Sequence, residues 1–527
     1  MFTISIIVLV AILVYVKFIT PCLYWRKKQV FYVKPWVRFF KVFLEEKSFA
    51  ESVKEAYDQF PQRRYFGSYQ FLQPSLFVRD LELIKKITVK DFEYFPDHFL
   101  LFSNNNDPIT GSNLFALKGE KWKDLRSTLS PAFTSSKMKS MFVLMSEIAE
   151  KYTANLAKND EVIQEWEMKN LFSKYTNDII ATCAFGINCD SLTDPQNEFF
   201  RMGKLLTIVT WSVTIRGMFI GFFPKLCEIL KITLFTKELT EFFSRTMKDT
   251  IAYRETKGII RPDMVHLLLE ARKGRLKDDI PHNINDAGFA TVQESTIGKK
   301  LNRKIEITDD IITAQALVFF FAGFDTASTV MSFLSYEIAL NQDIQKKLQL
   351  EIDNAMLECE GKISYEQILS LKYVDQVISE TLRKYPPGFV LNRVCAKKYV
   401  IEPKNEDERP LVLDKDCVVV VPVFGIHRDP NYFPNPDKFD PDRFNDENKS
   451  KIEPGTYMPF GAGPRNCIGS RFALLESKAL LVHLLWRFEI HPIKKTAIPL
   501  RLAKAVSLGS VDGFWLGLKK RRSNSNM

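Results

Sequence analysis

One cysteine lies in a loop that suits a metal ligand. Residues 460–469 read Phe-Gly-Ala-Gly-Pro-Arg-Asn-Cys-Ile-Gly, and an apolar stretch that predicts a helix over 469–487 follows at once. A thiol at the entrance of a helix feels the positive end of the helix dipole, which favours the thiolate. Backbone N–H groups in such a loop can donate to the sulfur, and the glycines let a flat ligand approach the backbone. Cys467 is therefore the candidate thiolate ligand.

Two other readings of this loop compete. A lone cysteine is most often a buried structural residue. A phosphate-binding loop would need a third glycine where Asn466 stands, and no suitable strand leads into it. The eight Cys and six His form no C-x-x-C or H-E-x-x-H pattern, so no zinc site is expected. Scattered cysteines indicate a reducing compartment.

A second chemical pair interrupts an apolar helix. Residues 311–324 are apolar except for Gln315, and Asp325 and Thr326 follow directly. Fourteen residues are short for a membrane span and suit a helix buried in protein. An acid and a hydroxyl in that setting need partners, because burial without them is costly. The alternative is that Thr326 only bonds back to the preceding turn.

These segments resemble the cytochrome P-450 haem-thiolate monooxygenases. The haem-ligand signature F-x-x-G-x-R-x-C-x-G matches at Phe460, Gly463, Arg465, Cys467 and Gly469. Three further family motifs follow: A-G-x-[DE]-T at 322–326, E-x-x-R at 380–383, and 439–444, which is similar to the P-E-R-F element with Asp442 in place of Glu. The likeness covers nearly the whole chain. It is strongest to insect microsomal members of the family-9 type, through residues 119–122, 129–134 and 184–186.

The resemblance implies a cofactor and its contacts. The cofactor is haem b with the Cys467 thiolate as axial ligand to the iron. The other cofactor-binding residues that the motifs imply are Phe460, Gly463, Arg465, Gly469, Trp122, Arg126 and Arg393. Of these, Trp122, Arg126 and Arg393 match positions that reach the haem propionates, a task that suits bidentate arginine.

The resemblance also implies catalytic and structural roles. Thr326 and Asp325 would help to deliver protons while dioxygen is reduced. Glu380 and Arg383 share one face of a helix at i, i+3, and with Arg443 they would form a buried charge network behind the haem. Taken without the family, the Glu380–Arg383 motif is equally an ordinary surface pair.

The implied reaction inserts one atom of dioxygen into a lipophilic small molecule, such as a plant toxin, an insecticide, a hormone or another lipid. The chain has no credible nicotinamide or flavin site, so electrons must come from a partner. The resemblance implies that this partner is NADPH–cytochrome reductase, sometimes aided by cytochrome b5. Lys118, Lys121 and Lys123 could steer an acidic partner. The expected pocket is apolar, lined by residues 99–102, Phe320, Phe324, 389–391 and 506–511.

Two other classes of function remain open. A haem-thiolate isomerase or dehydratase would rearrange peroxides without a reductase, but such relatives tend to lack the acid–Thr pair that Asp325 and Thr326 form. A membrane-bound haem or sterol carrier would bind its ligand without forming an oxidised product. A nucleic-acid partner is not expected, because the net charge of +10 is mild for 527 residues.

The first 25 residues predict a membrane anchor. They are almost wholly apolar and are followed by Arg26, Lys27 and Lys28, which holds the downstream side in the cytosol. Tyr24 and Trp25 are expected at the membrane interface. We therefore expect a single-pass anchor in the endoplasmic reticulum over 1–25, a linker and the start of the catalytic region over 26–60, and the haem-thiolate domain over 61–527. The sequon at Asn448 should then stay unmodified, and residues 218–223 could dip into the membrane a second time.

The remaining pattern predicts a mainly α fold, with one large helical domain and small β-sheets. Helices are expected over 45–60, 120–155, 165–186, 236–272 and 469–487, and several more over 309–385. Extended patterns are few, at 64–79, 390–402, 411–421 and in the last 30 residues. The polar segment 273–306 is expected to be a surface linker between helices.

Overall fold

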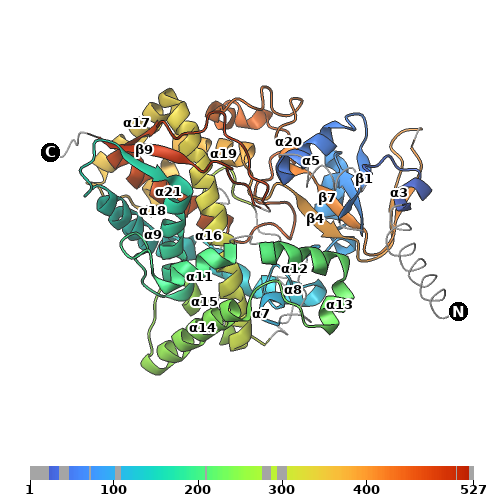
Figure 1. The fold of residues 1–527 in the computed structure, drawn as a ribbon, viewed down its shortest axis with the longest axis horizontal. Helices are drawn as coiled ribbons and strands as arrows, with labels where there is room; N and C mark the ends of the chain where they lie inside the picture. The colour runs from blue at the N-terminus through green and yellow to red at the C-terminus, as the bar shows by residue number, and fades with distance from the viewer. Residues whose placement is uncertain are drawn as a thin grey trace.

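The computed structural model describes residues 23–34, 47–70, 73–100, 108–207, 211–275, 287–292, 306–406, 408–505 and 507–521. The fold is mainly helical with small sheets, as expected. Many of the long helices lie on one side of the long helix α16 (Asp309–Leu340), while the largest sheet and α5 (Phe49–Asp58) lie on the other, together with several further helices (Figure 1). The predicted anchor residues 1–22, and most of segment 273–306, lie outside the described residues.

Helix α16 forms the centre of the protein because it is apolar almost all round. The Thr308 side chain caps its first turn by accepting from Ile311 N, and Asp309 and Asp310 favour the same end through the helix dipole. Among the described residues it is the one helix long and apolar enough to cross a membrane, yet most of it is buried by protein. The expectation of a buried core helix here is confirmed.

The other long helices pack around α16. They are α8 (Gly119–Leu129), α9 (Ser135–Leu156), α10 (Met168–Ile180), α11 (Glu198–Thr207), α14 (Lys237–Lys257), α15 (Met264–Arg272), α17 (Gln342–Glu358), α19 (Lys372–Lys384) and α21 (Ser470–Arg487). The helix predicted over 469–487 is confirmed. The single helices predicted over 120–155 and 236–272 are each two. Pro131 sits in a 3₁₀ turn after α8, and Gly258 ends α14 with a φ of 62°.

Three small sheets complete the fold. The first has the order β1 (Tyr65–Gln70), β2 (Gln73–Val78), β7 (Val418–Val421), β4 (Leu391–Val394). The second joins β3 (Gln164–Glu167), β9 (Trp515–Lys520) and β8 (Phe488–Pro492), and the third pairs β5 (Tyr399–Ile401) with β6 (Leu411–Leu413). The strands expected at 64–79, 390–402 and 411–421 are present. β8 was not expected, and the helix predicted from 165 begins instead as β3.

The segment around Trp25, at the end of the predicted anchor, packs against the first sheet. Trp25, in the short helix α3 (Tyr24–Lys27), is fully buried and donates its Nε1–H to Ser68 O at 2.8 Å. A Cβ on Gly67 would lie 2.4 Å from the Trp25 ring, so only glycine leaves room for it. Gly67 N donates to Phe31 O at 2.8 Å. The expectation that Trp25 lies at the membrane interface is therefore wrong, because its ring fills a slot in the protein.

Candidate active site

The loop that carries Cys467 is held in its shape by two glycines. Gly461 and Gly463 have φ angles of 82° and 71°, in the left-handed region. A Cβ on Gly463 would also lie 1.9 Å from Thr88 O, so no side chain fits there. Cys467 N donates to Phe460 O at 2.9 Å and closes the turn three residues before α21 begins. The loop thus leaves the Cys467 side chain exposed, while Arg465 is buried.

The middle of α16 is connected to this loop through Phe133. Ala322 and Thr326, one turn apart, are exposed there, whereas Phe324 and Ala327 are buried. The buried Phe133 ring connects this stretch with the Cys467 loop: it meets Phe319 with ring centroids 5.5 Å apart, and it lies 4.0 Å from where a Cβ on Gly469 would be. An accessible face on an otherwise buried helix, beside an exposed thiol, is what a flat cofactor requires.

Three arginines gather beside the loop. Arg126 donates to Asn466 O at 3.0 Å and to Asn466 Oδ1 at 2.8 Å. Arg393, on β4, donates to Ala462 O at 3.2 Å. The Arg465 guanidinium lies over the buried Trp122 ring at 4.0 Å, and it donates to Pro96 O, Leu117 O and Asp97 Oδ1. The structure thus brings Trp122, Arg126 and Arg393, the three side chains that the resemblance assigned to the haem propionates, to the loop that carries Arg465.

This cluster is rich in positive charge. Asp97 pairs with Arg465 at 3.2 Å. Burial lowers the pKa of Arg393 to about 10, and burial, opposed by Asp97 and helped by Arg393, lowers that of Arg465 to about 9. Arg393 Nε is buried with no hydrogen-bond partner among the described atoms. Three neighbouring guanidinium groups suit carboxylates of a ligand, and the two propionates of haem fit that donor set.

The Glu380–Arg383 pair is fully buried behind the loop. Arg383 Nε donates to Glu380 Oε2 at 2.7 Å, and its Nη1 donates to His427 O at 2.8 Å. Arg443 Nε lies 3.5 Å from Glu380 Oε1, which also accepts from Asp440 N at 2.9 Å. Glu380, the buried Arg383 and the half-buried Arg443 therefore fasten α19 to the segment that leads into the Cys467 loop.

Two histidines of the site were missed by sequence reasoning. His427 Nδ1 lies 3.1 Å from Arg383 O, and its Nε2 accepts from Met458 N at 3.0 Å, which ties α19 to the start of the loop. His98 Nδ1 lies 3.2 Å from Asn392 O and 3.4 Å from Arg393 Nη1. Burial, and then Arg393 and Arg465, hold the pKa of His98 well below its usual range. A single histidine without a motif gives no sequence signal of such a contact.

The predicted pocket lining needs correction on α16. Phe320 and Phe324 are buried against Phe185, Phe199, Phe200 and Phe243, because they lie on the side of the helix that faces α11 and α14. Phe321 is 45% exposed but lies one turn before Asp325, with its ring 6.5 Å from Phe235, so it does not share the face of Ala322 and Thr326. Phe319, three residues before Ala322 and in contact with Phe133, is the better lining candidate. Residues 101, 102 and 506, also expected in the pocket, lie outside the described residues.

Asp325 and Thr326 have different partners. The Thr326 hydroxyl donates back to Ala322 O, the local bond that was weighed as an alternative. Asp325 pairs with Lys169 of α10, with Nζ and Oδ1 2.8 Å apart. Lys169 was also missed by sequence reasoning, since it lies 156 residues from Asp325 in the chain. Thr326 therefore bonds within α16, whereas Asp325 connects α16 with a charged group on α10.

Comparison with known proteins adds independent evidence. A family model described as cytochrome P450 matches residues 33–513. Cytochrome P450 9e2 of Blattella germanica is 47% identical over 496 residues, which covers 91% of this chain and 90% of that protein. Probable cytochrome P450 9f2 of Drosophila melanogaster is 40% identical, with 94% and 95% covered. Cytochrome P450 6B7 of Helicoverpa armigera is 35% identical, with 96% of each chain covered.

Proposed function

Because the chain belongs to the cytochrome P450 family and is therefore a haem-thiolate monooxygenase, we propose that it oxidises lipophilic small molecules with electrons that a reductase takes from NADPH. The relatives also agree with the family-9 likeness of the motifs. The observation that carries the proposal is the exposed Cys467 in a loop that contains the buried Arg465 and accepts hydrogen bonds from the buried Arg126 and Arg393.

We assign the haem contacts to these residues. Cys467 is the iron ligand, Phe460, Gly463 and Gly469 shape its loop, and Arg126, Arg393 and Arg465 meet the propionates beside Trp122. When bound, thiolate-ligated haem supplies the activation of dioxygen and the transfer of one oxygen atom to the substrate. Glu380, Arg383 and Arg443 hold the loop from behind.

The chain's own residues supply protons and exclude water. Thr326 lies on the exposed face of α16, where its hydroxyl can pass a proton, and Asp325 is the adjacent acid. Phe319 and Ala322, three residues apart, make the same face apolar, which favours a lipophilic substrate selected by shape. Plant toxins, insecticides, hormones and other lipids all have this chemistry.

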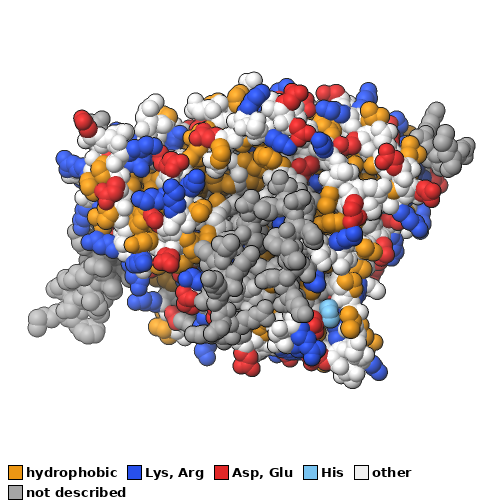
Figure 2. Space-filling model, turned by 180° about the vertical axis from the view of Figure 1, so that it is seen from behind, with side chains coloured by type: hydrophobic (Ala, Val, Ile, Leu, Met, Phe, Trp, Pro, Cys, Tyr) orange, Lys and Arg blue, Asp and Glu red, His pale blue; other side chains and the backbone are white. Residues whose placement is uncertain are grey.

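The redox partner is the second part of the proposal. Lys118 and Lys121 are exposed at the start of α8, whereas Lys123 is paired with Glu120 at 2.8 Å. The two exposed lysines could attract an acidic NADPH–cytochrome reductase or cytochrome b5. Over the back of the molecule, basic and acidic side chains are interspersed (Figure 2), which does not favour nucleic acid.

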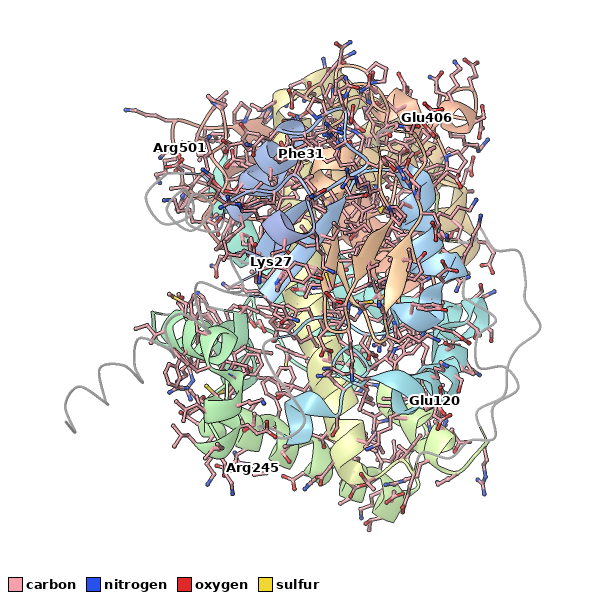
Figure 3. All side chains as sticks on the ribbon, turned by 90° about the vertical axis from the view of Figure 1, so that its right-hand side faces the viewer. Lys27, Phe31, Glu120, Arg245, Glu406 and Arg501 are labelled. Carbon is pink, nitrogen blue, oxygen red and sulfur yellow. The ribbon has the colours of Figure 1, made fainter. Side chains whose placement is uncertain are left out.

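The membrane is the third part. We place a single-pass anchor of the endoplasmic reticulum within residues 1–22, because Tyr24 and Trp25 bond to the folded domain. The catalytic region then starts over 26–60, and the cytosolic domain is 61–527. Exposed apolar side chains gather on α12 (Trp211–Phe222) and α13 (Pro224–Ile229), among them Ile215 and Ile229 at 60% and 77% exposure. Figures 1 and 3 place these helices on the same side as α3, where Lys27 and Phe31 lie. This side could rest on the bilayer.

The test is a spectrum. The reduced, carbon-monoxide-bound protein should show the far-red-shifted Soret band of thiolate-ligated haem, and Cys467→Ala should lose it. Cys359→Ala, which changes a half-buried thiol outside the site, is the matched control. A Cys467→Ala protein that keeps the band would remove the assignment. NADPH consumption with reductase in vesicles then tests the electron source, and turnover supported by peroxide alone would favour an isomerase.

A further inference from the structure

The Lys169 side chain makes more contacts with α16 than any ordinary surface lysine would. Its Nζ lies 2.8 Å from Asp325 Oδ1, 2.8 Å from Asp325 O, 2.8 Å from Ser328 Oγ and 2.6 Å from Thr329 Oγ1. An ammonium group has three protons to donate, so these four oxygen atoms saturate it. The contact therefore fixes both the Asp325 carboxylate and the backbone that carries it.

The position of Lys169 is itself fixed. Lys169 is the second residue of α10, and the Glu167 side chain caps that helix by accepting from Lys169 N and Asn170 N. The same carboxylate accepts from Phe514 N at 2.9 Å, which ties the cap to the segment before β9. Because its helix start is bonded on two sides, Lys169 is held in place before any ligand binds.

At this point of α16, side chains donate extra hydrogen bonds to the backbone carbonyls. Its carbonyl groups normally bond only to the N–H four residues on. Here Phe324 O also accepts from Ser328 Oγ at 2.6 Å and from Thr176 Oγ1 at 3.0 Å, and Asp325 O accepts from Lys169. Extra side-chain donors at helix carbonyls weaken the regular ladder and bend helices. Lys169 thus acts on the turn of α16 that contains Thr326.

The ion pair also connects this turn with solvent. The side chains of Lys169 and Asp325 are 27% and 18% exposed, although the ammonium itself is enclosed by oxygen atoms. Burial lowers the pKa of Lys169, and Asp325 and Glu167 oppose this. Thr326 is exposed on the inner face of the same turn. The Lys169–Asp325 pair reaches solvent, and Asp325 is the neighbour in the chain of Thr326, whose hydroxyl lies in the proposed site.

We propose that Lys169 is a positioning residue for proton delivery: it holds Asp325 and its turn of α16 where solvent protons can enter the site. This inference rests on the proposed monooxygenase function. Coupled turnover uses substrate, dioxygen, NADPH and one proton, and gives hydroxylated product, water and NADP⁺. Where protons arrive in the wrong place, dioxygen, NADPH and one proton give hydrogen peroxide and NADP⁺ instead.

The experiment compares Lys169→Met with Lys174→Met, a matched change on α10 whose side chain contacts no α16 group in the described structure, and with Lys169→Arg. Full-length protein in vesicles with NADPH and reductase is given an alkoxycoumarin, and hydrogen peroxide and product are both measured against NADPH consumed. Lys169→Met should raise the share of electrons found in peroxide by about threefold or more and raise the solvent isotope effect. Lys174→Met should match the wild type, and Lys169→Arg should restore part of the coupling.

A second readout does not depend on turnover. Amide hydrogen exchange over residues 322–330 should be faster in Lys169→Met and unchanged in Lys174→Met. If Lys169→Met only lowers the yield of folded protein, with normal partition of electrons and normal exchange in α16, its role is merely structural and the inference is overturned. If the wild type lacks the carbon monoxide band or consumes no NADPH, the proposed function itself fails, which is a different result.

Discussion

At the scale of single residues, the Cys467 loop depends on what glycine alone can do. Gly463 combines a left-handed backbone with a contact to Thr88 O that excludes a Cβ. Its role is steric, since it lets the loop pass close to the turn after α6 (Leu81–Lys85). The glycine of the signature motif is therefore required by the packing of the loop, and not only by the binding of its ligand.

This predicts the effect of Gly463→Ala. The added methyl group should cost about 2–4 kcal/mol of unfolding free energy and abolish haem loading, because backbone and overpacking strain add. Gly455→Ala is the control: its φ is 93°, but nothing lies within 4 Å of the new Cβ, so about 1 kcal/mol is expected. Urea unfolding and the carbon monoxide spectrum measure both. Equal losses in the two variants would contradict the steric role of Gly463.

A second residue-scale prediction concerns pH. Burial, and then Arg383, lower the pKa of His427 to about 3, well below that of an unfolded histidine near 6.5. The unfolded chain binds a proton first, so the contribution of His427 is complete above pH 6.5 and is lost as pH falls from there toward 3. At pH 4 the loss is about 3 kcal/mol.

Urea unfolding between pH 7 and pH 4 tests this. His427→Gln should be less stable at pH 7 but should show a shallower decline with acid than the wild type. His266→Gln, whose ring is half-buried on α15, should leave the slope unchanged. A wild-type slope that survives in His427→Gln would show that other groups cause the acid sensitivity.

At the scale of elements, an ion pair joins two helices that the sequence pattern predicts as one. Residues 236–272 form two helices, and the buried Arg254 on α14 grips Asp263, the cap of α15, through two hydrogen bonds. Gly186 packs against this pair, since a Cβ there would lie 1.9 Å from Arg254 Nη2. The pair therefore sets the angle between α14 and α15.

Asp263→Asn should accordingly cost about 3 kcal/mol, because it leaves a buried guanidinium without its charge partner. The exposed pair of Arg501 and Asp512 offers the control, and Asp512→Asn should leave the unfolding midpoint unchanged. Adding Arg254→Met to Asp263→Asn should recover part of the loss. A double variant as unstable as the sum of the single ones would argue against a coupled pair.

At the scale of the whole molecule, the segment that contains Tyr24 and Trp25 is bonded to the folded domain. Trp25 is plugged against Gly67, and Tyr24 donates to Asp414 at 2.8 Å. If the residues before Leu23 anchor the protein, the domain is then held close to the bilayer. The same side carries the apolar residues of α12 and α13.

Trypsin treatment of vesicle-bound protein tests this arrangement. Cleavage after Arg26 or Lys27 should be slow in the wild type, although both side chains are exposed, because the backbone around them is held. Trp25→Ala should cost about 3–5 kcal/mol in local packing and make the site cleavable. Rapid release of the domain from wild-type vesicles would show that the segment is a free linker.

Short-range pattern predicted much of this protein. The helix after Cys467, the buried helix that begins at Asp309 and the strands around Val78 and Val420 each follow from residues within a few positions of one another. The breaks after α8 and α14 were not predicted, although Pro131 and Gly258 mark them. Hydrophobic periodicity continues across both breaks, and the surrounding packing decides where a helix ends.

The amino-acid sequence by itself determined the thiolate loop, the acid–Thr pair and the family, because each is a contiguous motif. Only the tertiary structure decided that Trp25 is buried, that Phe320 packs against the rings of other helices, and that Arg393, His98 and Lys169 reach their partners. Those contacts join residues far apart in the chain, for instance Lys169 with Asp325 across 156 positions. Their geometry comes from how whole helices pack, which no local pattern specifies.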